Sequence, residues 1–450
     1  MAPFETDVMN LPTDKIKAPD APKAPFLEAR WYYSGFELAH DTYNAISAAS
    51  DGKIYYVLSS ESYEQGGQMY VYDPHTDKTR FLADLTEVCG EKGKNAIPQG
   101  KSHVRFYENR GKLYFVTHIG VYEMIDGMEC LPQHAPDGYE LYPGGHILSY
   151  NLASGEFEDL AIAPEGEGLI TMTLDRDRGH IYALTWPSGY LLQYNINTGK
   201  LTNAGLTCQR GEAGEVGQDY RVICRSMFVD PQDGAVYLST AEGDIITYRP
   251  DAATLRKLDG VDLRLDYFGK YNPTRPGSMA YNWRKIFWHS SEEVAYGVHG
   301  TSGYLFRFDP RKPRLELVER IASEPSRQSG MFDQFSYGYL GFQPGPDGQT
   351  IYYLTGGPVY VDGKRVKGED EIAKGGVKGI ENLHLITYNI PSQRYRDHGP
   401  VFYPDGTRPT YVNSIAIGAD GTVYTLARFE HEGKEIQDLV KIPNPFQENN

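Results

Sequence analysis

Three short segments of the chain carry side chains that could together do chemistry on a sugar. They are KSHVRFYENRGKLYFVTHIG with His103 and His118, TWPSGY with Trp186 and Tyr190, and DYRVICRS with Arg221 and Arg225. An indole stacks on the apolar face of a sugar ring, and a guanidinium pairs bidentately with a carboxylate. A neutral imidazole accepts a proton near neutral pH. These residue types indicate a site for an anionic sugar, which means a uronic acid or a sulfated sugar.

β-Elimination at a uronic acid is the reaction that these side chains fit. The carboxylate must be neutralised, a base must take the adjacent C5 proton, and an acid must protonate the departing O4. Arg225 or Arg221 can neutralise the carboxylate. His103 or His118 can take the proton, and Tyr190 can act as the acid or share the role of the base. The predicted catalytic set is therefore two histidines, a tyrosine and an arginine.

These segments belong to a chain built from seven repeats of one unit. In each repeat a turn precedes a strand that holds a tyrosine, and the seven anchors are Tyr55, Tyr114, Tyr182, Tyr237, Tyr296, Tyr352 and Tyr424. Six turns contain Gly, as in DGKIYYV, whereas EEVAYGV from Glu292 has lost it. Another strand, the third of each unit, follows the one with the tyrosine and begins at Gln68, His146, Tyr190, Asp244, Tyr304, His384 and Asp438. Seven four-stranded units predict an all-β, seven-bladed β-propeller, and their regular order disfavours a β-sandwich array or unrelated hairpins.

The last repeat lacks room for its outer strand, since only eight residues follow Ile442. A closed ring needs that strand from elsewhere, so we predict that FLEARWYYSGF, residues 26–36, completes the seventh blade. Residues 1–25, which contain Pro12, Pro19, Pro22 and Pro25, are expected to form an extended leader on the surface. Residues 26–450 are then a single propeller domain.

Propeller connectivity brings the start of each innermost strand, the end of each second strand and the start of each third strand to one mouth of a central funnel. His103 and His118 lie at the two upper ends of one hairpin. Hydrolysis needs two carboxylates flanking the bond, and these positions offer only Asp244 and Asp438, which are poorly placed as a pair. The predicted substrate-binding residues are Asn44, Trp186, Arg221, Arg284 (or Lys285), His299, Tyr339, Asn413 and Arg428.

The same motifs carry a family resemblance. The segment from KSHVRF through THIG, the TWPSGY turn and the following arginine resemble the seven-bladed propeller polysaccharide lyases, which include ulvan lyases and lyases of rhamnose–glucuronic acid linkages. The resemblance covers residues 40–250, and beyond them it is mainly the repeat architecture. It implies elimination without a cofactor, and it implies that His103, His118, Tyr190 and Arg225 are catalytic. The arginine could equally be Arg221 or Arg210.

Two other functions fit the same architecture. A metal-dependent lyase of the oligogalacturonate type would use several histidines, and His118, His146, His299 and His384 lie near the mouth. Their wide separation around the ring disfavours one tight metal site. A non-catalytic propeller that binds a sugar or a protein would need the tryptophan and arginine but neither the two histidines nor Tyr190.

Composition limits the partners. A net charge of −16 over 450 residues, with no Lys/Arg block, argues against nucleic acid and anionic membrane surfaces. No run of 18 apolar residues occurs, and Met1–Asn10 lacks the pattern of a signal peptide. We expect a monomer that acts on an acidic polysaccharide or oligosaccharide, secreted or periplasmic by function. Cys89 and Cys130 either form one bridge or stay unpaired.

Overall fold

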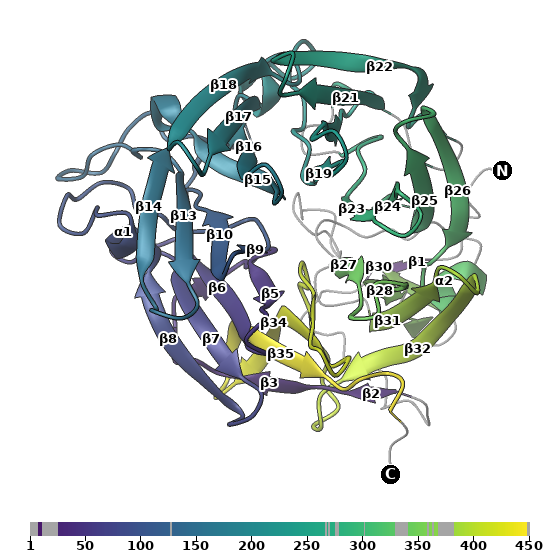
Figure 1. The fold of residues 1–450 in the computed structure, drawn as a ribbon. Helices are drawn as coiled ribbons and strands as arrows, with labels where there is room; N and C mark the ends of the chain where they lie inside the picture. The colour runs from purple at the N-terminus through teal and green to yellow at the C-terminus, as the bar shows by residue number, and fades with distance from the viewer. Residues whose placement is uncertain are drawn as a thin grey trace.

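The chain folds into seven small antiparallel sheets arranged as blades around a central axis (Figure 1). The computed structural model describes residues 8–10, 26–126, 128–265, 268, 271–274, 279–300, 302–328, 341–357, 360–361, 364–367 and 382–447. The chain passes from blade to blade around the ring, so the first blade lies beside the last (Figure 1). The predicted all-β, seven-bladed β-propeller is confirmed.

Each blade is a four-stranded meander whose innermost strand faces the axis. Blades 1 to 3 are β5 (Ile46–Ala48), β6 (Ile54–Ser60), β7 (Gln68–Asp73) and β8 (Lys78–Asp84); β9 (Tyr107–Asn109), β10 (Lys112–Val116), β13 (His146–Asn151) and β14 (Phe157–Ile162); and β15 (Gly168–Asp175), β16 (His180–Trp186), β17 (Tyr190–Asn195) and β18 (Lys200–Leu206). Blades 4 and 5 are β19 (Phe228–Val229), β20 (Val236–Ser239), β21 (Asp244–Arg249) and β22 (Thr254–Asp262); and β23 (Lys285–His289), β24 (Val294–Val298), β25 (Tyr304–Asp309) and β26 (Arg314–Arg320). Blade 6 is β27 (Gly341–Pro344), β28 (Thr350–Gly357), β31 (Asn382–Asn389) and β32 (Arg394–Phe402), and blade 7 is β33 (Ala416–Ile417), β34 (Val423–His431), β35 (Lys434–Ile442) and β3 (Arg30–Tyr32).

The repeated tyrosines lie on the second strand of each blade and are buried between blades. Tyr182 contacts Tyr248 of the next blade with ring centroids 6.0 Å apart. The turn before each tyrosine has a left-handed residue, such as Gly52 with φ of 80°, and in the repeat without Gly this residue is Glu293 with φ of 53°. The third strands begin where predicted in blades 1 to 5, but β31 and β35 begin earlier, because their hairpins pair over a longer register.

The N-terminal segment closes the ring, as predicted. β3 pairs antiparallel with β35, with Arg30 opposite Lys441, and completes blade 7. Just before it, β2 (Leu27–Glu28) pairs in parallel with β32 of blade 6. Trp31 stacks on Phe429 with ring centroids 4.6 Å apart. These purple N-terminal strands run beside the yellow C-terminal ones in Figure 1, so a single segment joins the last two blades.

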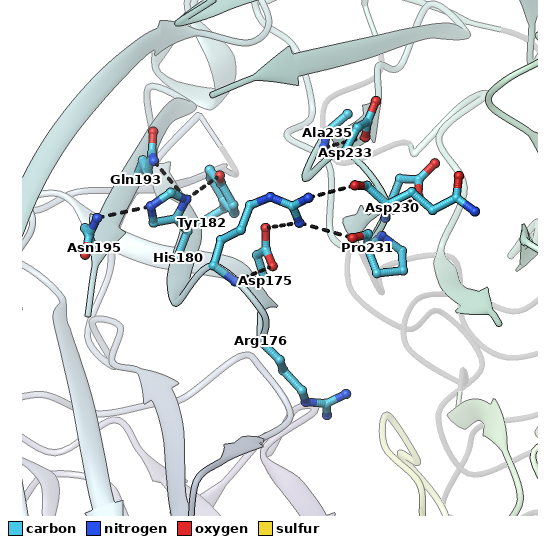
Figure 2. A network of polar contacts seen from close by, with 12 residues as sticks. Asp175, Arg176, His180, Tyr182, Gln193, Asn195, Asp230, Pro231, Asp233 and Ala235 are labelled. Atoms are coloured by element: carbon cyan, nitrogen blue, oxygen red, sulfur yellow. Dashed lines mark hydrogen bonds and ion pairs between the residues drawn. The ribbon is translucent and has the colours of Figure 1, made fainter. Parts of the chain in front are cut away.

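Polar contacts join neighbouring blades at the face where the innermost strands end. Arg178 of blade 3 donates to Asp175 Oδ2 (3.2 Å) and reaches blade 4 at Pro231 O (3.1 Å) and Gln232 O (2.8 Å); Asp175 and Pro231 are labelled in Figure 2. Gln232 in turn donates to Glu293 of blade 5 over 2.5 Å. The repeated turns therefore both reverse the chain and connect one blade to the next.

Shorter elements decorate the ring. They are β4 (Ala39–His40), α1 (Leu85–Val88), the hairpin β11 (Glu123–Ile125) and β12 (Met128–Cys130), α2 (Glu324–Gln328), and the sheet of β1 (Val8–Asn10), β29 (Tyr360–Val361) and β30 (Lys364–Lys367). Two 3₁₀ turns, Pro164–Gly166 and Gly211–Ala213, complete the set. Within the described ranges, no helix is both long and apolar enough to span a membrane. The four cysteines are unpaired, so Cys89 and Cys130 form no bridge.

Candidate active site around the central cavity

The innermost strands enclose a cavity of about 510 Å³ on the propeller axis. Three of the predicted site residues line it, namely Asn44, His103 and Arg225. Lys285 lines it as well, so of the two alternatives at that position the lysine is the one that faces the axis. Arg105 and Arg176 add two further cations to the wall. A protein with a net charge of −16 thus places positive charge around its axis.

His103 and His118 meet at the upper end of this cavity, where the innermost strands begin. Their rings stand edge to face at 80°, with centroids 4.7 Å apart. Backbone hydrogen bonds between Lys101 and His118, 2.9 and 2.8 Å long, hold the two ends of the hairpin together. The sequence prediction that these imidazoles converge is therefore correct, and the two residues are called the His pair below.

His118 is fully buried and His103 partly buried. Within the described structure, neither ring nitrogen of His118 nor Nε2 of His103 has a hydrogen-bond partner. Gly168 makes the close packing possible, because a Cβ there would lie 2.2 Å from Nδ1 of His118. Buried imidazole nitrogens without partners are costly to maintain, and such groups concentrate at functional sites.

The His pair is held in its neutral form. Burial, the neighbouring His118 and the positive charge of Lys101 set the pKa of His103 well below its usual value. Burial and the charges of Lys101 and Arg225 do the same to the pKa of His118. An imidazole that is neutral over the physiological range is able to accept a proton.

Lys101, which sequence reasoning missed, lies next to the His pair. It is fully buried, its Nζ donates to Glu61 Oε1 over 3.1 Å, and it lies 4.6 Å from the ring centroid of Tyr122. Burial lowers the pKa of Lys101. Burial would raise the pKa of Glu61, but hydrogen bonds from His40 and Lys101 bring it to about 2. The sequence did offer a signal for Lys101: it lies two residues before His103, and alternate residues of a predicted strand share a face.

Two tyrosines next to the His pair also escaped sequence reasoning. Tyr43 stacks on His103 with centroids 4.1 Å apart, and Tyr122 lies 6.2 Å from His118. Tyr190, the predicted acid, is the first residue of β17, packs against the core between blades 2 and 3, and is not among the residues that line the cavity. Tyr43 and Tyr122 do not line the cavity either, but among the described residues they have ring contacts with the His pair and Tyr190 has none.

Arg225 reaches the cavity but is already engaged by a carboxylate. Its Nη2 donates to Glu212 Oε1 over 2.6 Å, and its Nη1 donates to Ile223 O over 2.8 Å. The other oxygen of Glu212 accepts the indole N–H of Trp186 over 2.9 Å. Trp186 is only 3% exposed and packs edge-on against His118, so it is not the open stacking platform that we expected. Instead, the hydrogen bond from Trp186 holds Glu212 in place, and Glu212 in turn fixes the position of Arg225.

The remaining predicted binding residues are engaged in contacts of the fold. Arg221 pairs with Glu242 and lies over the ring of Tyr271 at 5.1 Å. Arg428 pairs with Asp41 and with Glu435 at 3.1 Å. These two arginines anchor loops, because their guanidinium groups already have carboxylate partners.

The other positions divide as follows. His299 is buried between Ser302 Oγ (2.9 Å) and Ala280 O (3.0 Å), and burial lowers its pKa to about 4. Asn413 is buried and donates to Thr42 O. Arg284 does not line the cavity, although its charge acts on His103. Tyr339 lies outside the described residues.

The histidines considered for a metal do not converge. His146 lies between Glu91 Oε1 (2.8 Å) and Asp159 Oδ1 (2.9 Å). Burial works against its charged form, yet these hydrogen bonds raise its pKa to about 11. His384 pairs with Asp397 at 3.0 Å on the opposite side of the ring. Among the described residues, no three His, Cys, Asp or Glu side chains are arranged to hold a metal ion.

Comparison with known proteins leaves the family open. No family model matches the chain, and no curated protein matches it. The chain is similar to a chain in the crystal structure of the mitotic checkpoint complex, with a TM-score of 0.48 and 11% identity over 98% of this chain and 100% of that one. It is similar to a putative 6-phosphogluconolactonase from Bacteroides uniformis ATCC 8492, with a TM-score of 0.40 and 11% identity over 78% and 83% of the two chains. A chain in the nidogen/laminin complex gives a TM-score of 0.36 and 10% identity over 66% and 94%. Similarity at this level identifies neither a family nor a function.

Proposed function

We propose that this protein is a polysaccharide lyase that cleaves a glycosidic bond to a uronic acid by β-elimination and leaves an unsaturated uronate. The observation that carries the proposal is the His pair: two neutral imidazoles in contact, at the mouth of a cavity lined by cations. A proton acceptor and a carboxylate-binding cation are the two groups that the first step of elimination needs.

The proposed roles follow from the positions of the groups. Arg225 pairs with the uronate carboxylate and so makes the C5 proton more acidic, while Glu212 keeps the guanidinium in place. His103, which lines the cavity, takes the C5 proton. The electron pair of that C–H bond forms the C4–C5 double bond, the C4–O4 bond breaks, and a proton passes to O4. Tyr43, stacked on His103, replaces Tyr190 as the proposed donor of that proton.

His118 is proposed as a positioning residue, because it is fully buried behind His103. The first substrates to test are polysaccharides with rhamnose–glucuronate linkages, including ulvan, since the sequence motifs resemble lyases that act on them. A polysaccharide substrate of this kind places the proposed site of action outside the cytoplasm, in a secreted or periplasmic protein.

The test is to incubate the protein with a panel of glucuronate-containing polysaccharides and to follow the ultraviolet absorbance of the unsaturated uronate. We expect absorbance to rise with at least one of them. No rise over the whole panel would end the proposal.

A second candidate is a propeller that binds an acidic glycan or a protein without cleaving it. The complete burial of His118 and the pairing of Arg225 with Glu212 favour this function, because both features could serve stability alone. Binding of a glycan from the same panel without any new ultraviolet absorbance would select it over the lyase.

A further inference from the structure

Three cations follow one another down the wall of the central cavity, past the His pair. Lys285 is the first residue of β23, at the upper end. Arg105 lies two residues after His103, in the segment that leads into β9, and Arg176 directly follows Asp175, the last residue of β15. All three line the same 510 Å³ cavity, although they come from blades 5, 2 and 3.

None of these cations is paired with a carboxylate in the part of the chain that the structure describes. Lys285 donates a hydrogen bond to the neutral side chain of Asn44. The guanidinium of Arg105 lies over the ring of Tyr107 at 4.8 Å, and Arg176 donates from Nε to the backbone oxygen of Glu108 over 2.9 Å. In each case the hydrogen-bond or ring partner is neutral, so none of the three cations forms an ion pair with a described residue, although the carboxylates of Glu108 and Asp177 act on Arg176 at longer range.

The acids of the cavity wall do not remove this excess. Asp175 is engaged by Arg178, and in Figure 2 the side chain of Arg176 extends away from that contact. Asp177, whose charge acts on Arg176, is exposed, as is Arg176 itself. Three cations thus face the cavity against one exposed carboxylate.

The three positive charges also act on one another. Burial and the charge of Arg105 lower the pKa of Arg176. Burial and the charges of Arg284 and Arg105 set the pKa of Lys285 well below its usual value. Arg105 is therefore close to both of the others, and like charges gathered in a partly buried space destabilise the fold unless an anion offsets them.

We propose that the central cavity binds a multivalent oxyanion, of the class of inorganic phosphate or sulfate, between Arg105, Arg176 and Lys285. A guanidinium offers a fork of N–H donors that matches the oxygens of such an ion, and the lysine adds a point charge. The cavity is large enough to hold the ion together with water. The site goes beyond the proposed lyase function, because it uses none of the residues given a catalytic role and requires no reaction.

The experiment titrates the full chain with inorganic phosphate and with inorganic sulfate in a calorimeter and in thermal unfolding, against sodium chloride at the same ionic strength. We expect saturable heat, and a melting temperature that rises with the logarithm of the phosphate or sulfate concentration but not with chloride. In Arg105→Gln we expect the dissociation constant to rise by about tenfold or more. Arg314→Gln, at an arginine that is 74% exposed on β26, should bind as the wild type does.

The wild-type titration alone can overturn the proposal, so it does not depend on the variant folding. No saturable heat with either ion, or equal melting temperatures in phosphate, sulfate and chloride, would refute it. Equal affinity in wild type and Arg105→Gln would also refute it. The lyase assay is a separate test. If the protein binds phosphate but cleaves no polysaccharide, the oxyanion site stands and the proposed lyase function fails. If it cleaves a polysaccharide but binds neither ion, the lyase function stands and the oxyanion site fails.

Discussion

The imidazole of His118 stands edge-on to that of His103, with ring centroids 4.7 Å apart, and has no hydrogen-bond partner among the described residues. Lys101 and Arg225 add positive charge on two sides, and their charges favour the neutral form of both rings. In this contact the buried His118 therefore sets the orientation of His103, which lines the cavity. Five predictions concern this contact and the closure of the ring.

The first prediction concerns how His118 is positioned. Gly168→Ala places a Cβ 2.2 Å from Nδ1 of His118 and must displace the ring. We expect polysaccharide cleavage to fall by about 10²-fold or more, as it should in His103→Ala, because the loss of a positioned proton acceptor costs about 10²–10⁴-fold. The measurement is the initial rate of absorbance increase, with circular dichroism to check the fold.

The matched control is His75→Ala, at an exposed histidine in the turn between β7 and β8, which should leave the rate unchanged. Wild-type rates in both His103→Ala and Gly168→Ala would contradict the assigned role of the His pair.

The second prediction is the pH dependence of cleavage. An ordinary histidine has a pKa of about 6.5, and burial and neighbouring cations lower the pKa of His103 and His118. The base therefore stays unprotonated as the pH falls through about 6.5, and kcat/KM should not fall there. A half-maximal point at or above about pH 6.5 on the acid side of the profile would show that the imidazole is not perturbed in this way.

The third prediction separates two tyrosines. Tyr43 stacks on His103, whereas Tyr190 packs between blades and has no ring contact with either histidine among the described residues; neither tyrosine lines the cavity. Each is changed to Phe, which removes the hydroxyl and preserves the ring. We expect kcat to fall by about tenfold or more in Tyr43→Phe and to stay near wild type in Tyr190→Phe, since only a group at the reacting atoms can donate the proton. The opposite result would restore Tyr190 as the acid.

The fourth prediction concerns the contact that holds the N-terminal segment in place. Asp438, fully buried on β35, accepts hydrogen bonds from Ser34 N (2.7 Å) and Ser34 Oγ (2.6 Å). Ser34→Ala removes the hydroxyl donor from a buried carboxylate and should lower the free energy of unfolding by about 1–3 kcal/mol. Urea unfolding measures this loss, and Ser154→Ala, at an exposed turn, is the control.

Asp438 also gives this contact a pH dependence. Burial raises its pKa to about 6, partly opposed by the hydrogen bonds from Ser34. A carboxyl whose pKa is higher in the folded state contributes stability below its unfolded pKa of about 3.8 and loses that contribution as the pH rises through about 6. Asp438→Asn should therefore lose less stability than the wild type between about pH 4 and about pH 7. Parallel pH profiles for the two proteins would contradict this.

Much of the architecture could be predicted from the sequence, because it depends on local patterns. The tyrosines at Tyr55 and its six equivalents mark second strands, and the left-handed turn persists even where Glu293 replaces Gly. A strand alternates its side chains with a period of two, and a tight turn needs particular backbone angles, so both leave a trace within a few residues. The missing outer strand of the last repeat likewise identified the N-terminal segment, and β3 occupies that place.

The candidate site depended on the tertiary structure to a larger degree. The sequence by itself determined that His103 and His118 end one hairpin, and hence that they meet. It could not determine that Arg428 is paired with Asp41, 387 residues away, or that Glu212 holds both Trp186 and Arg225. Whether a polar side chain is free for a ligand depends on which distant segment packs against it. Closure of the ring determines which distant segments come into contact, and no pattern within a few residues of the sequence can predict those contacts.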